Sequence, residues 1–74
     1  MTKKQLVEEI QRAEAKAWKE FQDSKAIWGK DDAITARRSA KWMALFDLRE
    51  ALGVDPMPID QLIAEDLVPA AVAI

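Results

Sequence analysis

The chain has 74 residues, of which 50% are apolar and 32% are charged, and its formal net charge at pH 7 is −2. This length allows one domain, and the apolar content, which includes three tryptophans, is too high for a disordered segment. Cysteine and histidine are both absent, which excludes disulfides, thiolate chemistry and nitrogen-ligated metal sites of the usual kind. The small negative charge favours neither nucleic acid nor acidic lipid as a partner.

The N-terminal residues include lysines but no apolar run behind them, so we predict no secretory signal peptide. No stretch reaches the roughly 18 consecutive apolar residues of a membrane span. The lack of cysteine is typical of a reducing compartment. We therefore expect a cytoplasmic protein that is not embedded in a membrane.

The first predicted helix covers about residues 2–28. Thr2 suits an N-cap position, and lysines accumulate toward the C-terminal end, where they complement the helix dipole. Apolar and small side chains recur every three or four residues and form one stripe along this helix. The residues predicted to face the core are Leu6, Ile10, Ala13, Ala17, Phe21, Ser24 and Trp28.

A glycine-containing turn at 29–31 precedes the second predicted helix, 32–52. Asp31 or Asp32 can cap this helix, and Gly53 can end it. Because the connection is short, the two helices must be antiparallel neighbours. The core-facing residues predicted on the second helix are Ile34, Trp42, Leu45, Leu48 and Leu52.

Reflecting the two helices about the turn sets their register. It places Phe21 level with Lys41, and Ala13 level with Leu48. Basic side chains on the second helix should then bury their stems and reach acids on the first. The expected cross-helix partners are Arg38, Lys41 and Arg49 on one side, and Glu14, Glu20 and Asp23 on the other.

Two prolines and an aspartate make 53–59 an extended turn rather than a helix. A short third helix is predicted at about 60–67 with Asp60 as its cap, and an apolar tail follows at 68–74. The chain is thus predicted to be a single all-α domain: a long antiparallel helical hairpin followed by a short C-terminal helix.

The only groups suited to catalysis are carboxylates. Glu20 with Asp23, and Asp47 with Glu50, form pairs three residues apart that could hold magnesium. This arrangement resembles the acidic motifs of all-helical nucleotide pyrophosphohydrolases of the MazG type. However, the pairs fall at different levels of the hairpin, and Asp47 and Glu50 point toward solvent. We therefore predict no enzyme activity and assign no catalytic, cofactor-binding or metal-binding residue.

Arg37, Arg38 and Lys41 form a basic cluster that could contact nucleic acid. Nucleic-acid surfaces usually concentrate basic residues without interleaved acids and raise the domain's isoelectric point, which this acidic chain does not do. Pairing across the hairpin is the favoured interpretation. A dimeric nucleic-acid-associated regulator remains the alternative function.

Large apolar side chains flank the predicted core stripes. Val7 and Trp18 lie along one edge of the first helix, and Trp42, Met43 and Phe46 lie along one edge of the second. A hairpin cannot bury both of its edges, so the third helix or a protein partner must cover this surface. The predicted interface comprises Val7, Trp18, Trp42, Met43, Phe46, Leu62, Ile63 and Leu67.

A chain below roughly 70–80 residues rarely forms a sufficient core alone and usually adds a disulfide, a metal or a partner chain. Without cysteine or histidine, the third solution is the expected one. We predict a homodimer that resembles a four-helix bundle, in which two-fold symmetry brings the same aromatic edge of each chain together.

Residues of both helices and their turn also carry a family resemblance: Trp18, Phe21, Gly29, Lys30, Asp31, Asp32, Arg38, Trp42, Leu45, Asp47 and Leu48. Over residues 14–52 the chain resembles small helical-hairpin proteins of phages and mobile elements of Gram-positive bacteria. The resemblance implies a setting and contributes no site residues. With the missing catalytic groups, it predicts a non-catalytic protein-interaction module, such as an adaptor or inhibitor of a host protein.

Overall fold

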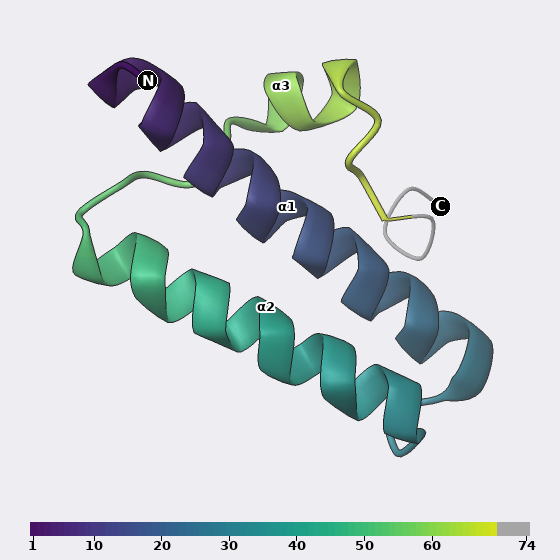
Figure 1. Cartoon of the computed structure of the whole chain (residues 1–74). Coiled ribbons are helices and arrows are strands. Elements are labelled where there is room, and N and C mark those ends of the chain that lie inside the picture. The colour runs from purple at the N-terminus through teal and green to yellow at the C-terminus, as the bar shows by residue number, and fades with distance from the viewer. Residues whose placement is uncertain (70–74) are drawn as a thin grey trace.

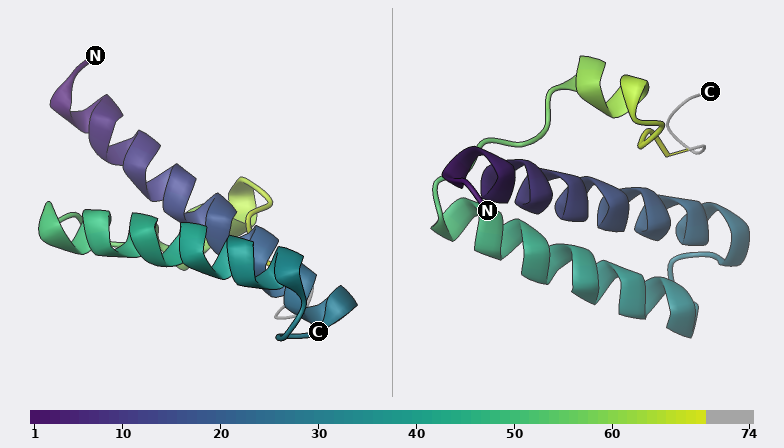
Figure 2. Two further views of the ribbon diagram at one scale, coloured as in Figure 1. Left: turned by 60° about the horizontal axis from the view of Figure 1, so that its bottom comes forward. Right: turned by 45° about the horizontal axis from the view of Figure 1, so that its top comes forward.

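The structure, a computed structural model, describes residues 1–69 as three α-helices without a strand. α1 spans Lys3–Trp28, α2 spans Ala33–Ala51 and α3 spans Ile59–Ala64. α1 lies between α2 and α3 (Figure 1), and the two long helices cross obliquely (Figure 2). The all-α class and the helical hairpin are therefore confirmed. Most of the predicted apolar tail, residues 70–74, lies outside the described part of the chain.

Side chains cap the first turns of both long helices. Thr2 Oγ1 accepts a hydrogen bond from the backbone N–H of Gln5, and the Gln5 side chain accepts one from the backbone N–H of Thr2, which makes a capping box. Asp32, rather than Asp31, caps α2, because its carboxylate accepts the N–H of Ile34 at 2.8 Å. These local bonds fix where each long helix begins.

α2 ends in a Schellman motif at Gly53, as its position in the sequence predicts. Gly53 has a φ of 68°, which a residue without a Cβ adopts without strain. Its N–H donates to the carbonyl of Glu50, and the N–H of Val54 donates to the carbonyl of Arg49.

α3 begins earlier than predicted. Pro58 occupies its N-cap position, and no side chain among residues 1–69 caps this helix. Pro58 holds φ at −60°, which directs the chain into a helical turn from the next residue onward. The prediction that Asp60 caps α3 was therefore wrong, since Asp60 lies inside the first turn.

α3 also ends at Ala64 instead of near residue 67. Asp66 adopts a left-handed conformation with a φ of 55°, and the N–H of Leu67 donates to the carbonyl of Leu62 at 2.8 Å. With the bond from the N–H of Asp66 to the carbonyl of Ile63 at 3.2 Å, this forms a second Schellman motif, which closes the helix well before Pro69.

The core between α1 and α2 is rotated relative to the predicted stripes. Thr35 and Arg49 of α2 are buried, whereas Leu48 and Leu52 are 48% and 56% exposed. The aromatic rings of α2 carry more apolar area than its leucines, so rotation toward the rings buries more surface. Other residues predicted to be in the core are also exposed: Leu6, Ala13, Trp28 and Ile34.

The predicted register is correct. Lys41 Nζ lies 4.0 Å from Glu20 Oε2, and Arg49 Nε lies 3.1 Å from Glu14 Oε1. Arg38 also reaches across the hairpin, but it donates to the hydroxyl of Ser24 and to the backbone carbonyl of Glu20 rather than to a carboxylate.

Candidate interaction surfaces

Four aromatic rings pack together between α1 and α2. The ring centroids of Trp18 and Trp42 are 4.7 Å apart, and Phe46 lies 5.4 Å from Trp42. Phe21 completes this aromatic cluster at 5.9 Å from Trp18 and 6.1 Å from Trp42. All four side chains are half-buried. Trp18, Trp42 and Phe46, which were predicted to form an open edge, thus pack on one another and on the predicted core residue Phe21 within a single chain.

A hollow of about 340 Å³ opens beside this aromatic cluster. The hollow is lined by three aromatic residues, Trp18, Trp42 and Phe46, and by Glu14, Arg49 and Pro56. Pro56 belongs to the extended connection between α2 and α3, which therefore passes over this end of the hairpin (Figure 1).

Arg49 forms the polar wall of that hollow and is only 4% exposed. Besides its ion pair with Glu14, it donates to the backbone carbonyl of Val54 at 2.8 Å and to Glu50 Oε1 at 3.2 Å. Its guanidinium also lies 5.2 Å from the ring centroid of Phe46. Because these contacts compensate its charge, Arg49 has the surroundings of a structural residue rather than a ligand-binding one.

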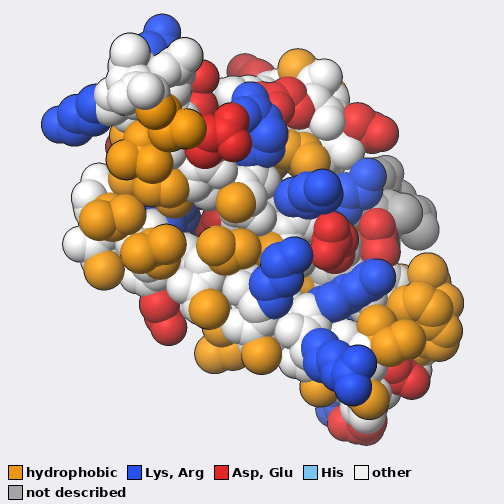
Figure 3. Space-filling view, in the orientation of Figure 1, with side chains coloured by type: hydrophobic (Ala, Val, Ile, Leu, Met, Phe, Trp, Pro, Cys, Tyr) orange, Lys and Arg blue, Asp and Glu red, His pale blue; other side chains and the backbone are white. Residues whose placement is uncertain are grey.

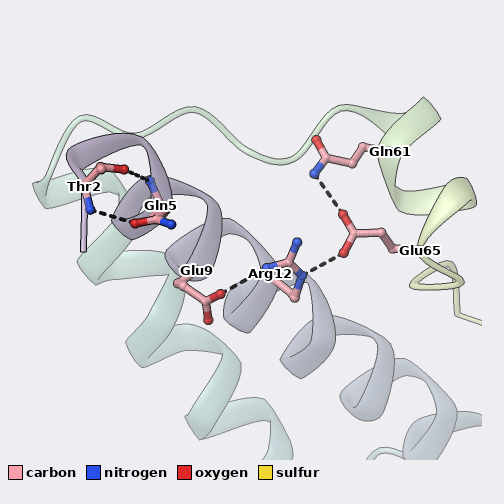
Figure 4. Close-up of polar contacts among 6 residues, drawn as sticks. All are labelled: Thr2, Gln5, Glu9, Arg12, Gln61 and Glu65. Carbon is pink, nitrogen blue, oxygen red and sulfur yellow. Dashed lines mark hydrogen bonds and ion pairs between the residues drawn. The ribbon is translucent and has the colours of Figure 1, made fainter.

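Polar contacts attach α3 to α1, as Figure 4 shows. Arg12 Nε donates to Glu65 Oε1 at 2.7 Å, and the Gln61 amide donates to the other oxygen of Glu65 at 2.8 Å. The hydrogen bond from Arg12, followed by that from Gln61, lowers the pKa of Glu65. The same bond with Glu65 raises the pKa of Arg12, which Glu9 also contacts at 3.2 Å.

Two further polar bonds fasten the segments on either side of α3. Gln11 donates to the backbone carbonyl of Asp55 at 2.8 Å, and Lys19 donates to that of Asp66 at 3.1 Å. Meanwhile Ile59 and Ile63, one helical turn apart on α3, remain 70% and 63% exposed. Polar bonds thus join α3 and its flanking segments to α1, while Ile59 and Ile63 point outward.

A second hollow, of about 630 Å³, lies between the N-terminal part of α1 and the start of α3. Val7, Lys4 and Gln11 line it from α1, opposite Pro58 and Gln61. Val7, a predicted interface residue, is thus placed at this hollow and not in the aromatic cluster.

The eight residues of the predicted interface are divided among several places. Trp18, Trp42 and Phe46 share the aromatic cluster, while Met43 is exposed on α2. Ile63 is exposed on α3. Val7, Leu62 and Leu67 are half-buried.

Leu48 and Leu52 of α2, which were predicted to lie in the core, are instead exposed on its surface. Figure 3 shows apolar side chains gathered over the N-terminal half of α1 and the C-terminal half of α2, with charged side chains beyond them. Leu48 and Leu52 of α2, and Leu6 of α1, are the exposed leucines in these parts of the helices. The sequence of α2 could have predicted this exposed surface, because the helix carries apolar residues on two sides. Both sides were instead assigned to a single core.

The acidic pairs do not assemble into a metal site within residues 1–69, where no group of three or more possible ligands occurs. Glu20 contacts Lys41 instead, and Glu50 contacts Arg49. In the same part of the chain, no helix is long and apolar enough to cross a membrane.

Compared with protein-family models, with curated proteins and with solved structures, the chain matches none. Its function must therefore be inferred from its own surfaces.

Proposed function

We propose that this chain is a non-catalytic helical interaction module that acts by binding another protein surface, in the cytoplasm. The observation that carries the proposal is the set of large apolar side chains left exposed on regular helices. Leu48 and Leu52 on α2, and Ile59 and Ile63 on α3, are each about half exposed or more. Apolar surface that a fold leaves open on rigid elements is typical of protein interaction sites.

The described polar groups support the same proposal, because the buried and half-buried arginines hold segments of the chain together. Arg49, Arg38 and Arg12 all bond to other segments of the chain. An adaptor or inhibitor of a host protein, of the kind found in phages and mobile elements, would require such a scaffold and no reactive group. A homodimer is one form that this module can take.

Regulation through nucleic acid is the second candidate function, and it rests on Arg37, Arg38 and Lys41. Two of these three side chains are engaged inside the hairpin: Arg38 with Ser24, and Lys41 with Glu20. Retardation of DNA that weakens steeply with salt would favour this function over protein binding.

Magnesium-dependent nucleotide hydrolysis is the remaining alternative. We expect no turnover of nucleoside triphosphates with Mg²⁺. Hydrolysis that disappears in Asp47→Asn would contradict the proposal.

Quantitative affinity capture tests the proposed function directly. The tagged chain should retain one protein in stoichiometric amount, and purified components should reproduce the binding. Ile63→Ser or Leu48→Ser should weaken that binding, because each removes an exposed apolar contact. Asp47→Asn, an exposed change on the same hairpin, should leave it intact. A chain that binds neither a foreign protein nor itself would overturn the proposal.

A further inference from the structure

The hollow beside the aromatic cluster has the size and the lining of a site for a small ligand. Its volume of about 340 Å³ lies near the lower end of the range for ligand pockets, roughly 300–1,000 Å³. Trp18, Trp42 and Phe46 line it, and each of these side chains is only half-buried. Part of each ring therefore remains open to a ligand.

The segment that contributes Pro56 to this hollow is fixed in place. Arg49 donates to the carbonyl of Val54, and Gln11 donates to the carbonyl of Asp55, both at 2.8 Å. The hollow is thus bounded by two long helices and by a connection that is bonded to both of them. A site formed in this way exists before its ligand arrives, so little ordering is required on binding.

Glu14 is the polar group of the hollow that can still accept a hydrogen bond. Its Oε1 atom accepts from Arg49 at 3.1 Å, and no described residue donates to its Oε2 atom. Among residues 1–69, the only buried side-chain polar atom without a partner is the hydroxyl of Thr35, so Oε2 of Glu14 is accessible to solvent. A ligand that brings one hydrogen-bond donor can therefore reach this oxygen.

The charges around the hollow favour a neutral ligand. The guanidinium of Arg49 lies 5.2 Å from the ring centroid of Phe46, which is the place that a bound cation would take, and it would repel a second cation. An anion gains little, because Glu14 and Glu50 both pair with this guanidinium. Aromatic walls instead suit another aromatic ring, which packs on them edge-to-face or with an offset.

We propose that this hollow binds a neutral aromatic ring of the indole type, which carries a single N–H donor. The ring packs against Trp18, Trp42 and Phe46, and its N–H donates to Oε2 of Glu14. Free small molecules and the tryptophan side chain of a protein partner share this chemistry. The site does not depend on the proposed interaction function, which rests on apolar side chains of other surfaces.

The chain's own tryptophans report the binding. Trp18 and Trp42 line the hollow, whereas Trp28, the last residue of α1, does not. Titration with indole should shift the side-chain N–H resonances of Trp18 and Trp42 to saturation and leave that of Trp28 unchanged. N-methylindole is the matched probe. It keeps the ring but lacks the donor, so it should bind at least fivefold more weakly.

Two variants locate the site on the chain. Phe46→Leu should weaken indole binding at least fivefold, because it removes one aromatic wall. Trp28→Leu is the matched control, since it also replaces a ring by leucine but lies away from the hollow, and it should bind indole as the natural chain does. Circular dichroism checks that both variants remain helical.

A further probe, N-acetyltryptophanamide, distinguishes the two sources of the ring. Binding at least as tight as that of indole supports the site as one for a tryptophan side chain, and weaker binding supports it as one for a free small molecule.

Three results would overturn the inference. They are the absence of a saturable shift at Trp18 and Trp42 with millimolar indole, equal affinity for indole and N-methylindole, and saturable binding of tetramethylammonium, which would identify a cation site. A chain that does not bind indole but captures a protein through its exposed leucines would leave the proposed function intact.

Discussion

Arg49 is a buried cation whose partners come from three parts of the chain: Glu14 on α1, Glu50 beside it, and the Val54 carbonyl in the connection. A leucine at this position could fill the space but could not bind any of these oxygens. The guanidinium suits it because its planar fork donates in several directions at once. Arg49 therefore fixes the end of α2 against α1 and against the chain that follows.

Removing this cation should be costly. Arg49→Met leaves the partly buried carboxylate of Glu14 without its ion pair, so we expect a loss of about 3 kcal/mol in the free energy of unfolding. Urea denaturation measures the change. Adding Glu14→Leu should recover most of the loss, since both charges are then gone. A double variant as unstable as Arg49→Met would show that the packing of the arginine stem, rather than its charge, was decisive.

Unlike Arg49, Thr35 buries a polar atom that makes no hydrogen bond within residues 1–69. Its side chain is 1% exposed, and its hydroxyl has no hydrogen-bond partner among residues 1–69. Thr35→Val keeps the shape and removes this oxygen, so it should raise the free energy of unfolding by about 1 kcal/mol. Thr35→Ser, which keeps the hydroxyl and loses the methyl group, should lower it. A valine variant that melts below the natural chain would reveal a partner for the hydroxyl.

At Gly53, backbone conformation alone should limit which residues the position accepts. Its φ of 68° is left-handed, and no described neighbouring atom lies within 4 Å of the place a Cβ would take. Gly53→Val should therefore cost about 1 kcal/mol or more through backbone strain and not through collision. Gly53→Asn is the control and should cost less, because asparagine tolerates this conformation. Equal thermal melts for the natural chain and the valine variant would contradict the assigned cap.

At the scale of elements, the sequence predicted what local chemistry determines. The N-cap at Thr2, a cap by one of the two aspartates before α2, and the stop at Gly53 all depend on a few neighbouring residues. The register was also predictable, because a short turn leaves one alignment for two antiparallel helices. These features required no knowledge of distant contacts.

The rotation of α2 could not be predicted in the same way. The helix has two apolar sides, and hydrophobic periodicity alone does not say which side faces α1. The answer depends on the packing of Trp18 with Trp42 and on burial of Thr35 and Arg49, which rank as polar in any pattern. For that reason Leu48 and Leu52 were assigned to the core, and the open surface they form was missed.

The attachment of α3 depends on a carboxylate, so it should respond to acid. Hydrogen bonds from Arg12 and Gln61 lower the pKa of Glu65. The ionised carboxylate therefore favours attachment of α3 to α1 at any pH above the usual pKa of a glutamate. This advantage is lost as the pH falls through the lowered pKa of Glu65. We expect the amide resonances of α3 to shift there while those of α2 change little.

Two variants separate this effect from general acid unfolding. Glu65→Gln should loosen α3 at neutral pH and remove its response to acid. Glu9→Gln should leave α3 docked, because Glu9 contacts Arg12 only from within α1. Concerted loss of all three helices at one pH would contradict a separate release of α3.

Across its Cα atoms the described part of the chain measures 38 × 24 × 17 Å. α1 lies between α2 and α3, so the described segments leave the side of α2 that faces away from α1 open (Figure 1). Such an arrangement offers little interior, and much of its stability must come from whatever covers it.

If the cover is a second copy, thermal stability must depend on concentration. Dimer formation binds only folded chains, so the melting temperature should rise as the protein is concentrated from about 1 to 100 μM, in the direction that mass action requires. Leu48→Lys should melt lower, at a temperature independent of concentration. Met43→Lys should keep the slope of the natural chain. A flat profile for the natural chain would be inconsistent with dimerisation over that range.

The polar bonds of α3 also determine the order in which the chain can assemble. The bond between Arg12 and Glu65 joins residues 53 apart, whereas that between Ser24 and Arg38 joins residues 14 apart. Closing the longer loop costs more entropy, so the hairpin should form first and α3 should dock last. During translation, the α1 surface around Arg12 would then lack its Glu65 contact until residue 65 leaves the ribosome. A chaperone that recognises nascent chains would have its opportunity to bind in that interval.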